Sequence, residues 1–142
     1  MEFLELLQTG RPVLLDGGMG TMLQAAGLGL GERPELFGLE HPEVVEGVHR
    51  AYLEAGSRVL YANTFGANAH KLSGTGCTVE EVISANVSTA RRVAGDRAKV
   101  ALDVGPIGEL PEPLGTLSFE EAYEIYGQMV RAGEAAGPMS TR

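Results

Sequence analysis

Three short apolar runs, each followed by a longer amphipathic stretch, constrain the fold of this chain more than any other feature. The runs are residues 13–15, 59–62 and 100–104. The longer stretches carry apolar residues at helical spacing, as Val44, Val45 and Val48 do. Short strands that alternate with longer helices predict parallel strands joined by right-handed crossovers. We therefore predict an α/β fold rather than a helical bundle or a β-sandwich.

Local signals predict where the helices begin. Thr78 with Glu81, and Ser118 with Glu121, form capping boxes in which each side chain can bind a free N–H group of the other residue. Pro42 suits the first position of the helix before them. Each of these helices follows or precedes one of the apolar runs, as the alternating pattern requires.

The segment before Pro42 is less regular. Residues 19–26 contain helix-forming residues and are expected to form a short helix that ends at Gly27. Residues 29–39 are rich in glycine and contain Pro34, so we expect a loop there.

Composition limits the classes of function. The net charge is −8, and such a surface repels phosphate backbones, so we expect no nucleic-acid partner. No apolar run approaches about 18 residues, so we expect no membrane span. The first residues lack the basic start of a secretory signal, which makes a cytoplasmic location the expectation. Cys77 is the single cysteine, which excludes a disulfide within the chain and an all-cysteine zinc site.

Each predicted strand ends in a polar, glycine-rich cluster. The clusters are residues 16–18 (Asp-Gly-Gly), 63–66 (Asn-Thr-Phe-Gly) and 103–106 (Asp-Val-Gly-Pro). In parallel α/β folds the ligand lies beyond the carboxyl ends of the strands. A single cluster is readily explained as a turn, but three at the same relative position favour a binding site.

Asp16 has several possible roles at its strand end. A carboxylate there can bind an ammonium group, act as a base, or cap the next helix. Gly17, Gly18 and Gly20 bring backbone N–H groups to the same place, which suits a ligand carboxylate. An acid beside such donors matches a zwitterionic amino acid. On residue chemistry alone, the binding and capping roles are both open.

Other chemistries lack support in the sequence. The G-x-G at residues 18–20 has a leucine where a dinucleotide fingerprint needs its third glycine, and no Gly-Lys-Ser/Thr of a P-loop follows. His70 and Cys77 have no second histidine or cysteine at metal spacing. Structural or surface roles are expected for His41 and His49. We predict no catalytic and no metal-ligating residue in this chain.

These residues together resemble a known family. Residues 14–24 (Leu-Leu-Asp-Gly-Gly-Met-Gly-Thr-Met-Leu-Gln) are similar to the opening strand and turn of homocysteine S-methyltransferases. Residues 41–45, 63–65 and 103–108 continue the same pattern in order. The resemblance covers about residues 13–136. Within the family, the likeness is to the N-terminal homocysteine-binding domain of cobalamin-dependent methionine synthase.

The resemblance implies a (β/α)8 TIM barrel that methylates the thiol of homocysteine to form methionine. In the family, zinc lowers the pKa of that thiol, and cobalamin or methylfolate carries the methyl group. By resemblance, Asp16 binds the amino group of homocysteine, and Gly17 and Gly18 bind its carboxylate. Asn63 and Thr64 line the pocket.

The resemblance also sets limits. The family's zinc cysteines belong to later barrel strands and match no residue of this sequence. The 142 residues, taken as one domain, correspond to an N-terminal fragment with about the first three βα units. A complete barrel has roughly 250 residues. We expect no methyl transfer by this chain alone and expect the missing barrel half, or further methionine synthase domains, as its partner. The alternative hypothesis is a non-catalytic α/β amino-acid-binding or assembly module.

Overall fold

The computed structural model describes residues 2–137; residue 1 and the sequence 138–142, which contains no apolar run, lie outside the described residues. The elements in chain order are α1 (Phe3–Gln8), α2 (Gly20–Ala25), α3 (Pro34–Glu40), α4 (Pro42–Glu54), β1 (Val59–Tyr61), α5 (Ala69–Leu72), α6 (Val79–Ala94), β2 (Lys99–Ala101) and α7 (Phe119–Ala136).

The strands are parallel, as the alternating pattern predicts. β1 pairs with β2 in a register that places Leu60 opposite Val100. The predicted strand at residues 13–15 is reduced to one parallel bridge between Leu15 and Val59. Leu60 and Val100 are buried beneath the helices, whereas Leu15 is 50% exposed on the sheet. The result is a mixed α/β fold with a narrow sheet.

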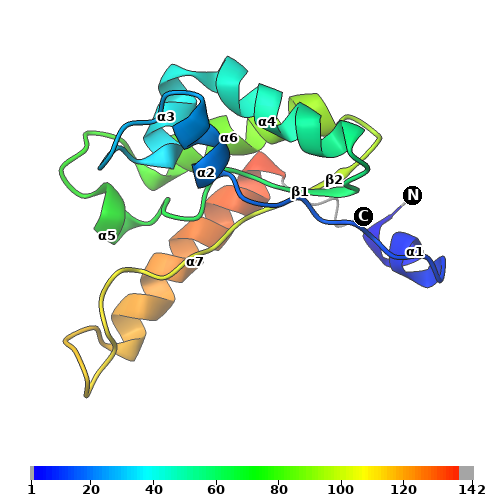
Figure 1. The fold of residues 1–142 in the computed structure, drawn as a ribbon. Helices are drawn as coiled ribbons and strands as arrows, with labels where there is room; N and C mark the ends of the chain where they lie inside the picture. The colour runs from blue at the N-terminus through cyan, green and yellow to red at the C-terminus, as the bar shows by residue number, and fades with distance from the viewer. Residues whose placement is uncertain (1, 138–142) are drawn as a thin grey trace.

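The helices give the fold most of its core. α2, α3, α4 and α6 gather on one side of the strands, and α7 runs diagonally away from them (Figure 1). α6 is central, because it packs against α3, α4, α7 and both strands. Fully buried apolar side chains of this core include Leu60, Val82, Ile83, Val87, Ala90 and Met129. The spacing of the apolar residues in α6 explains its role, since they form one continuous buried stripe.

Both predicted capping boxes are confirmed. The Thr78 hydroxyl accepts the N–H of Glu81 at 3.1 Å, and the Glu81 carboxylate accepts the N–H of Thr78 at 2.9 Å. Ser118 and Glu121 repeat this arrangement at the start of α7. These bonds fix where the two longest helices begin, and with them the loops that precede them.

Thr78→Ala should lower the free energy of unfolding by about 1 kcal/mol, because the N–H of Glu81 loses its partner. Urea unfolding followed by circular dichroism measures the change. Ser88→Ala is the control, since Ser88 is exposed in the middle of the same helix and has no capping role. Equal stability of the wild type and Thr78→Ala would contradict the assignment.

The prediction of a loop over residues 29–39 is wrong in its second half, where α3 forms. Pro34 occupies the first turn of α3 and Glu35 is acidic at its N-terminus, which are both favourable features. Gly38 disfavours a helix in isolation. The structure shows why a glycine is accepted there: a Cβ at Gly38 would collide with the buried side-chain amides of Asn86 and Asn63. Tertiary packing therefore decides the conformation of this segment.

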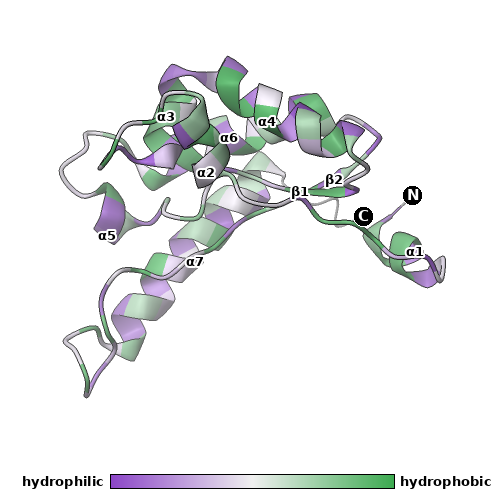
Figure 2. Cartoon of the chain, in the orientation of Figure 1, coloured by the Kyte–Doolittle hydropathy of each residue, from purple (hydrophilic) through white to green (hydrophobic). Residues whose placement is uncertain are grey.

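α7 and the loop that precedes it project away from the other helices, and the projecting part of α7 carries hydrophobic residues among polar ones (Figure 2). Phe119 and Tyr123 are 77% and 64% exposed there. None of the helices within residues 2–137, α7 included, is long and apolar enough to cross a membrane.

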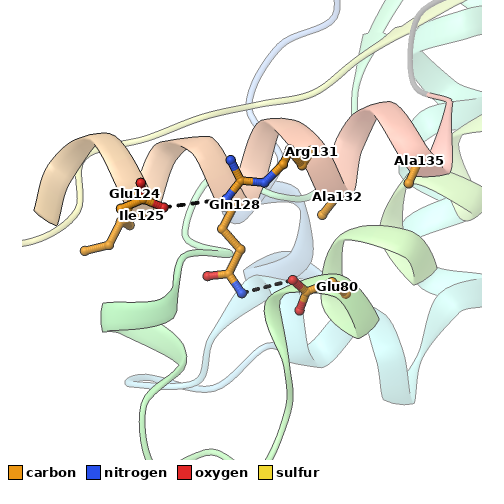
Figure 3. Close-up of a pocket in the computed structure, with 7 residues that line it drawn as sticks. All are labelled: Glu80, Glu124, Ile125, Gln128, Arg131, Ala132 and Ala135. Carbon is orange, nitrogen blue, oxygen red and sulfur yellow. Dashed lines mark hydrogen bonds and ion pairs between the residues drawn. The ribbon is translucent and has the colours of Figure 1, made fainter. Parts of the chain in front are cut away.

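A groove of about 490 Å³ lies between α7 and the start of α6 (Figure 3). The polar side chains along it pair with one another: Gln128 donates to Glu80 at 3.0 Å, and Arg131 lies 3.9 Å from Glu124. The groove shares no lining residue with the cavity at the strand ends, and these polar groups already have partners. We therefore place the candidate site elsewhere.

Candidate functional site

A cavity of about 320 Å³ opens at the carboxyl ends of the strands. Its lining residues are Asp16, Gly17, Gly18, Met19, Gly20, Pro34, Glu35, Tyr61, Ala62, Asn63, Thr64, Phe65 and Asp103. All three strand-end clusters contribute to this lining, as the parallel arrangement of the strands leads one to expect. Its volume falls at the lower end of the range for small-molecule sites, about 300–1,000 Å³.

Asp16 is held by the sheet and not by a helix. Its carboxylate Oδ2 accepts the backbone N–H of Tyr61 at 3.0 Å, across the gap between neighbouring strands. The N-terminus of α2 has no side-chain cap. Of the two roles that the sequence left open, capping is therefore not the one adopted.

The second oxygen of Asp16 has no partner. Oδ1 is buried and accepts no hydrogen bond within the described part of the chain. Burial raises the pKa of Asp16 to about 6; the hydrogen bond from Tyr61 opposes this shift, and the nearby charge of Asp103 adds to it. A buried carboxylate oxygen without a donor has a high affinity for a cationic hydrogen-bond donor.

The glycine turn after Asp16 packs against α4. The Tyr52 hydroxyl donates to the carbonyl oxygen of Gly18 at 2.9 Å. A Cβ at Gly17 would lie only 3.0 Å from that hydroxyl oxygen, so a side chain there would require Tyr52 or the turn to shift by a few tenths of an ångström. The N–H groups of Gly17 and Gly18 donate to no other group among residues 2–137. They are available to a ligand.

Thr64 and Asn63 use their side chains to hold the cavity wall together. The Thr64 hydroxyl donates to the carbonyl oxygen of Asp103 at 2.9 Å and accepts the N–H of Asp103 at 3.1 Å. The Asn63 amide nitrogen donates to the carbonyl oxygen of Pro34 at 2.7 Å. Both residues line the cavity, and their side-chain hydrogen bonds connect the end of β1 to α3 and to the end of β2.

Two acidic residues join Asp16 at the cavity. Glu35 is 5% exposed, and its carboxylate accepts the N–H of Gly66 at 2.6 Å. Burial raises the pKa of Asp103, and the charge of Glu35 raises it further. Three carboxylates and no lysine, arginine or histidine line the cavity. The cavity therefore favours a positively charged group.

Glu35 was missed because its segment was predicted to be a loop. The available signal was the dipeptide Pro34-Glu35, which is typical of a helix start. Asp103 belonged to a predicted strand-end cluster, but its neighbours in the sequence do not distinguish it from an ordinary turn residue.

The residues present do not form a zinc site. Among residues 2–137 no group of three His, Cys, Asp or Glu side chains is arranged to hold a metal ion. Cys77 is partly buried beside the start of α6, and its N–H donates to the Thr75 hydroxyl at 3.3 Å. His70 lies 3.5 Å from Glu109 and does not line the cavity.

Comparisons with known proteins agree with the geometry of the strand ends. The family model described as homocysteine S-methyltransferase matches residues 13–138. Betaine–homocysteine S-methyltransferase 1 from Sus scrofa is 34% identical over 134 residues, which are 89% of this chain and 48% of that protein. Methionine synthase from Mycobacterium tuberculosis is 36% identical over 115 residues, which are 71% of this chain and 10% of that protein.

A solved structure shares the fold. The metallated form of the homocysteine methyltransferase MmuM from Escherichia coli superposes with a TM-score of 0.77 at 25% sequence identity. The superposition covers 95% of this chain and 54% of that structure. The chain thus spans about half the length, or less, of the proteins that it matches. Because the family model matches most of the sequence, the chain belongs to the homocysteine S-methyltransferase family.

Proposed function

We propose that this chain holds homocysteine for transfer of a methyl group to its thiol, with Asp16 as the ligand of the ammonium group. The observation that carries the proposal is the buried Oδ1 of Asp16, which has no partner and borders an acidic cavity. The free N–H groups of Gly17 and Gly18 lie next to it and are suited to the substrate carboxylate. Cation and anion sites side by side match the two charges of an amino acid.

In the proposed reaction a bond forms between the homocysteine sulfur and the methyl carbon. The bond between that carbon and the donor breaks, the thiol proton leaves, and the product is methionine. The share that we assign to this chain is to bind and orient the substrate. Asn63 and Thr64 belong to this proposal as lining residues whose hydrogen bonds keep the cavity walls in place.

The identity of the methyl acceptor is better supported than that of the methyl donor. Homocysteine appears in the description of the family and in the names of the pig and E. coli relatives. The resemblance to methionine synthase suggests cobalamin or methylfolate as the donor, whereas the name of the pig relative suggests betaine. We propose that the zinc ligands belong to later strands of the barrel, as the resemblance to the family implies.

We further propose that residues 1–142 form the first part of a (β/α)8 barrel, about three βα units, and that the remaining units are its partner. The parallel strands, the helices on one side of them, and the coverage of about half of the E. coli structure support this proposal.

Isothermal titration with L-homocysteine tests the binding role. We expect wild-type protein to bind, and Asp16→Asn to bind at least about tenfold more weakly, because a neutral amide replaces the charge opposite the ammonium group. N-acetylhomocysteine, which lacks that ammonium group, should bind the wild type as weakly as homocysteine binds Asp16→Asn. If both ligands bind the wild type equally, Asp16 does not hold the amine.

A further inference from the structure

A buried amide on α6 connects two segments that line the cavity, the start of α3 and the loop after β1. Asn86 is 1% exposed and does not line the cavity. Its side-chain nitrogen donates to the carbonyl oxygens of Glu35 and Val82, each at 3.0 Å. Its side-chain oxygen accepts the amide of Asn63 at 3.3 Å. Asn86 therefore bonds to α3 and to the loop after β1 at the same time.

The contact between those two walls is completed by Glu35. Its carboxylate accepts the N–H of Gly66, in the loop after β1, at 2.6 Å. A Cβ at Gly66 would lie 2.8 Å from the same carboxylate oxygen, so the two segments approach as closely as a glycine allows. The Asn63 amide also donates to Pro34, the residue before Glu35. The start of α3 is thus bonded to the loop in three ways: directly by Asn63 and by Glu35, and through Asn86.

The glycine in α3 fits this arrangement. Gly38 lies on the same helix, one turn after Pro34 and Glu35, where any Cβ would collide with the Asn86 side-chain oxygen and lie 2.9 Å from the Asn63 nitrogen. The Asn86 amide therefore fixes how closely α3 approaches the loop.

We infer that Asn86 is a positioning residue for substrate binding, which sets the separation of the cavity walls formed by Pro34-Glu35 and by Asn63-Phe65. This inference rests on the proposed function, because the bound molecule is taken to be homocysteine. Asn86 acts through Glu35 and Asn63 and touches no ligand. Its removal changes the shape of the cavity while leaving Asp16 and its hydrogen bond to Tyr61 in place.

The first test compares Asn86→Leu with wild type by titration with L-homocysteine. We expect Asn86→Leu to bind about tenfold more weakly, which is the loss that corresponds to about 1.4 kcal/mol. Val93→Ala is the matched control, because Val93 is a buried residue near the end of the same helix and makes no polar contact. It should lose stability and retain its affinity. If folded Asn86→Leu binds like wild type, the inference is wrong.

A double-mutant cycle separates positioning from a general loss of stability. Gly38→Ala should weaken homocysteine binding in the wild type, where the new methyl group pushes α3 away from the Asn86 amide. In the Asn86→Ala background the nearest atom, the Asn86 side-chain oxygen, is gone and only the Asn63 nitrogen remains close, so Gly38→Ala should have a much smaller effect on affinity than it has in the wild type. Additive losses in the double variant would show that Asn86 and Gly38 do not act through the same contact.

A measurement without ligand distinguishes failure of this inference from failure of the proposed function. The N–H of Gly66 should exchange slowly with solvent in wild type, since a buried carboxylate accepts it. In Asn86→Leu its exchange should become faster, and in Val93→Ala it should not. An unchanged Gly66 rate in Asn86→Leu would overturn the inference, whereas a wild type that binds no homocysteine would overturn the function.

Discussion

Asp16→Asn should raise the free energy of unfolding of the ligand-free chain at pH 7.5 by about 2 kcal/mol. The pKa of Asp16 rises from 3.8 to about 6 on folding. A carboxyl group with a raised pKa opposes folding once it is ionised, so the penalty grows between pH 3.8 and 6 and is complete above that range. The full shift corresponds to about 3 kcal/mol, and we reduce this for solvent screening of a partly exposed group.

Asparagine at position 16 keeps a side-chain oxygen that can accept a hydrogen bond and removes the negative charge. Its side-chain oxygen can still accept the N–H of Tyr61, and a neutral amide is buried at lower cost than a carboxylate. Urea unfolding at pH 7.5 and at pH 4 measures the effect, which should fall below about 1 kcal/mol at the lower pH. Asp96→Asn, at an exposed residue after α6, should show no such difference between the two pH values. A wild type more stable than Asp16→Asn at pH 7.5 would refute the argument.

The second large effect is expected at His49, which is fully buried in α4. Neither ring nitrogen has a hydrogen-bond partner within the described residues. Burial lowers the pKa of His49 from 6.5 to about 4, and the nearby carboxylate of Glu46 opposes the shift only in part. As the pH falls from 6.5 towards 4, His49 is therefore protonated in the unfolded chain but remains neutral in the folded chain. The contribution of His49 to the free energy of unfolding should therefore decrease by about 2 kcal/mol between pH 7 and pH 5.

His49→Leu should remove that decrease. The leucine has no group to protonate and leaves no unpaired ring nitrogen in the core, so the variant should be more stable than wild type at pH 5. Because Asp16 acts in the opposite direction over the same range, the measurement is the difference between variant and wild type at each pH. His41→Leu serves as the control, since the His41 side chain is half exposed. A difference that stays constant between pH 7 and 5 would rule out a neutral buried imidazole.

The parts of the fold that depend on local signals were predictable. Thr78 and Ser118 start their helices where their capping boxes indicate, because the hydrogen bonds involved span only three residues. The parallel pairing of β1 with β2 was predictable from the alternation of strands and helices. That Asp16, Asn63 and Asp103 meet at one cavity also follows, because the carboxyl ends of parallel strands share one edge of the sheet.

What the sequence did not reveal depends on contacts between distant residues. α3 was missed because Gly38 disfavours a helix locally. A glycine is needed there because of the close contact with Asn86, which is 48 residues further along the chain. Glu35 and Asn86 resemble ordinary surface residues in the sequence, and only burial and their hydrogen bonds distinguish them. The sequence also did not reveal that the first strand is reduced to a single bridge at Leu15, because the length of a strand depends on its pairing with the neighbouring strand.

In several of the hydrogen bonds that shape the cavity, the donor residue and the acceptor residue differ in how freely they can be substituted. Side chains of Tyr52, Thr64 and Asn86 donate to backbone carbonyl oxygens, those of Gly18, Asp103 and Glu35. Every amino acid provides the accepting carbonyl, so substitution at that end leaves the bond possible. Only a few side chains provide the donor at the right distance. Among related proteins, the amino acids at positions 52, 64 and 86 should therefore change slowly, even though none of these three side chains has to touch the substrate.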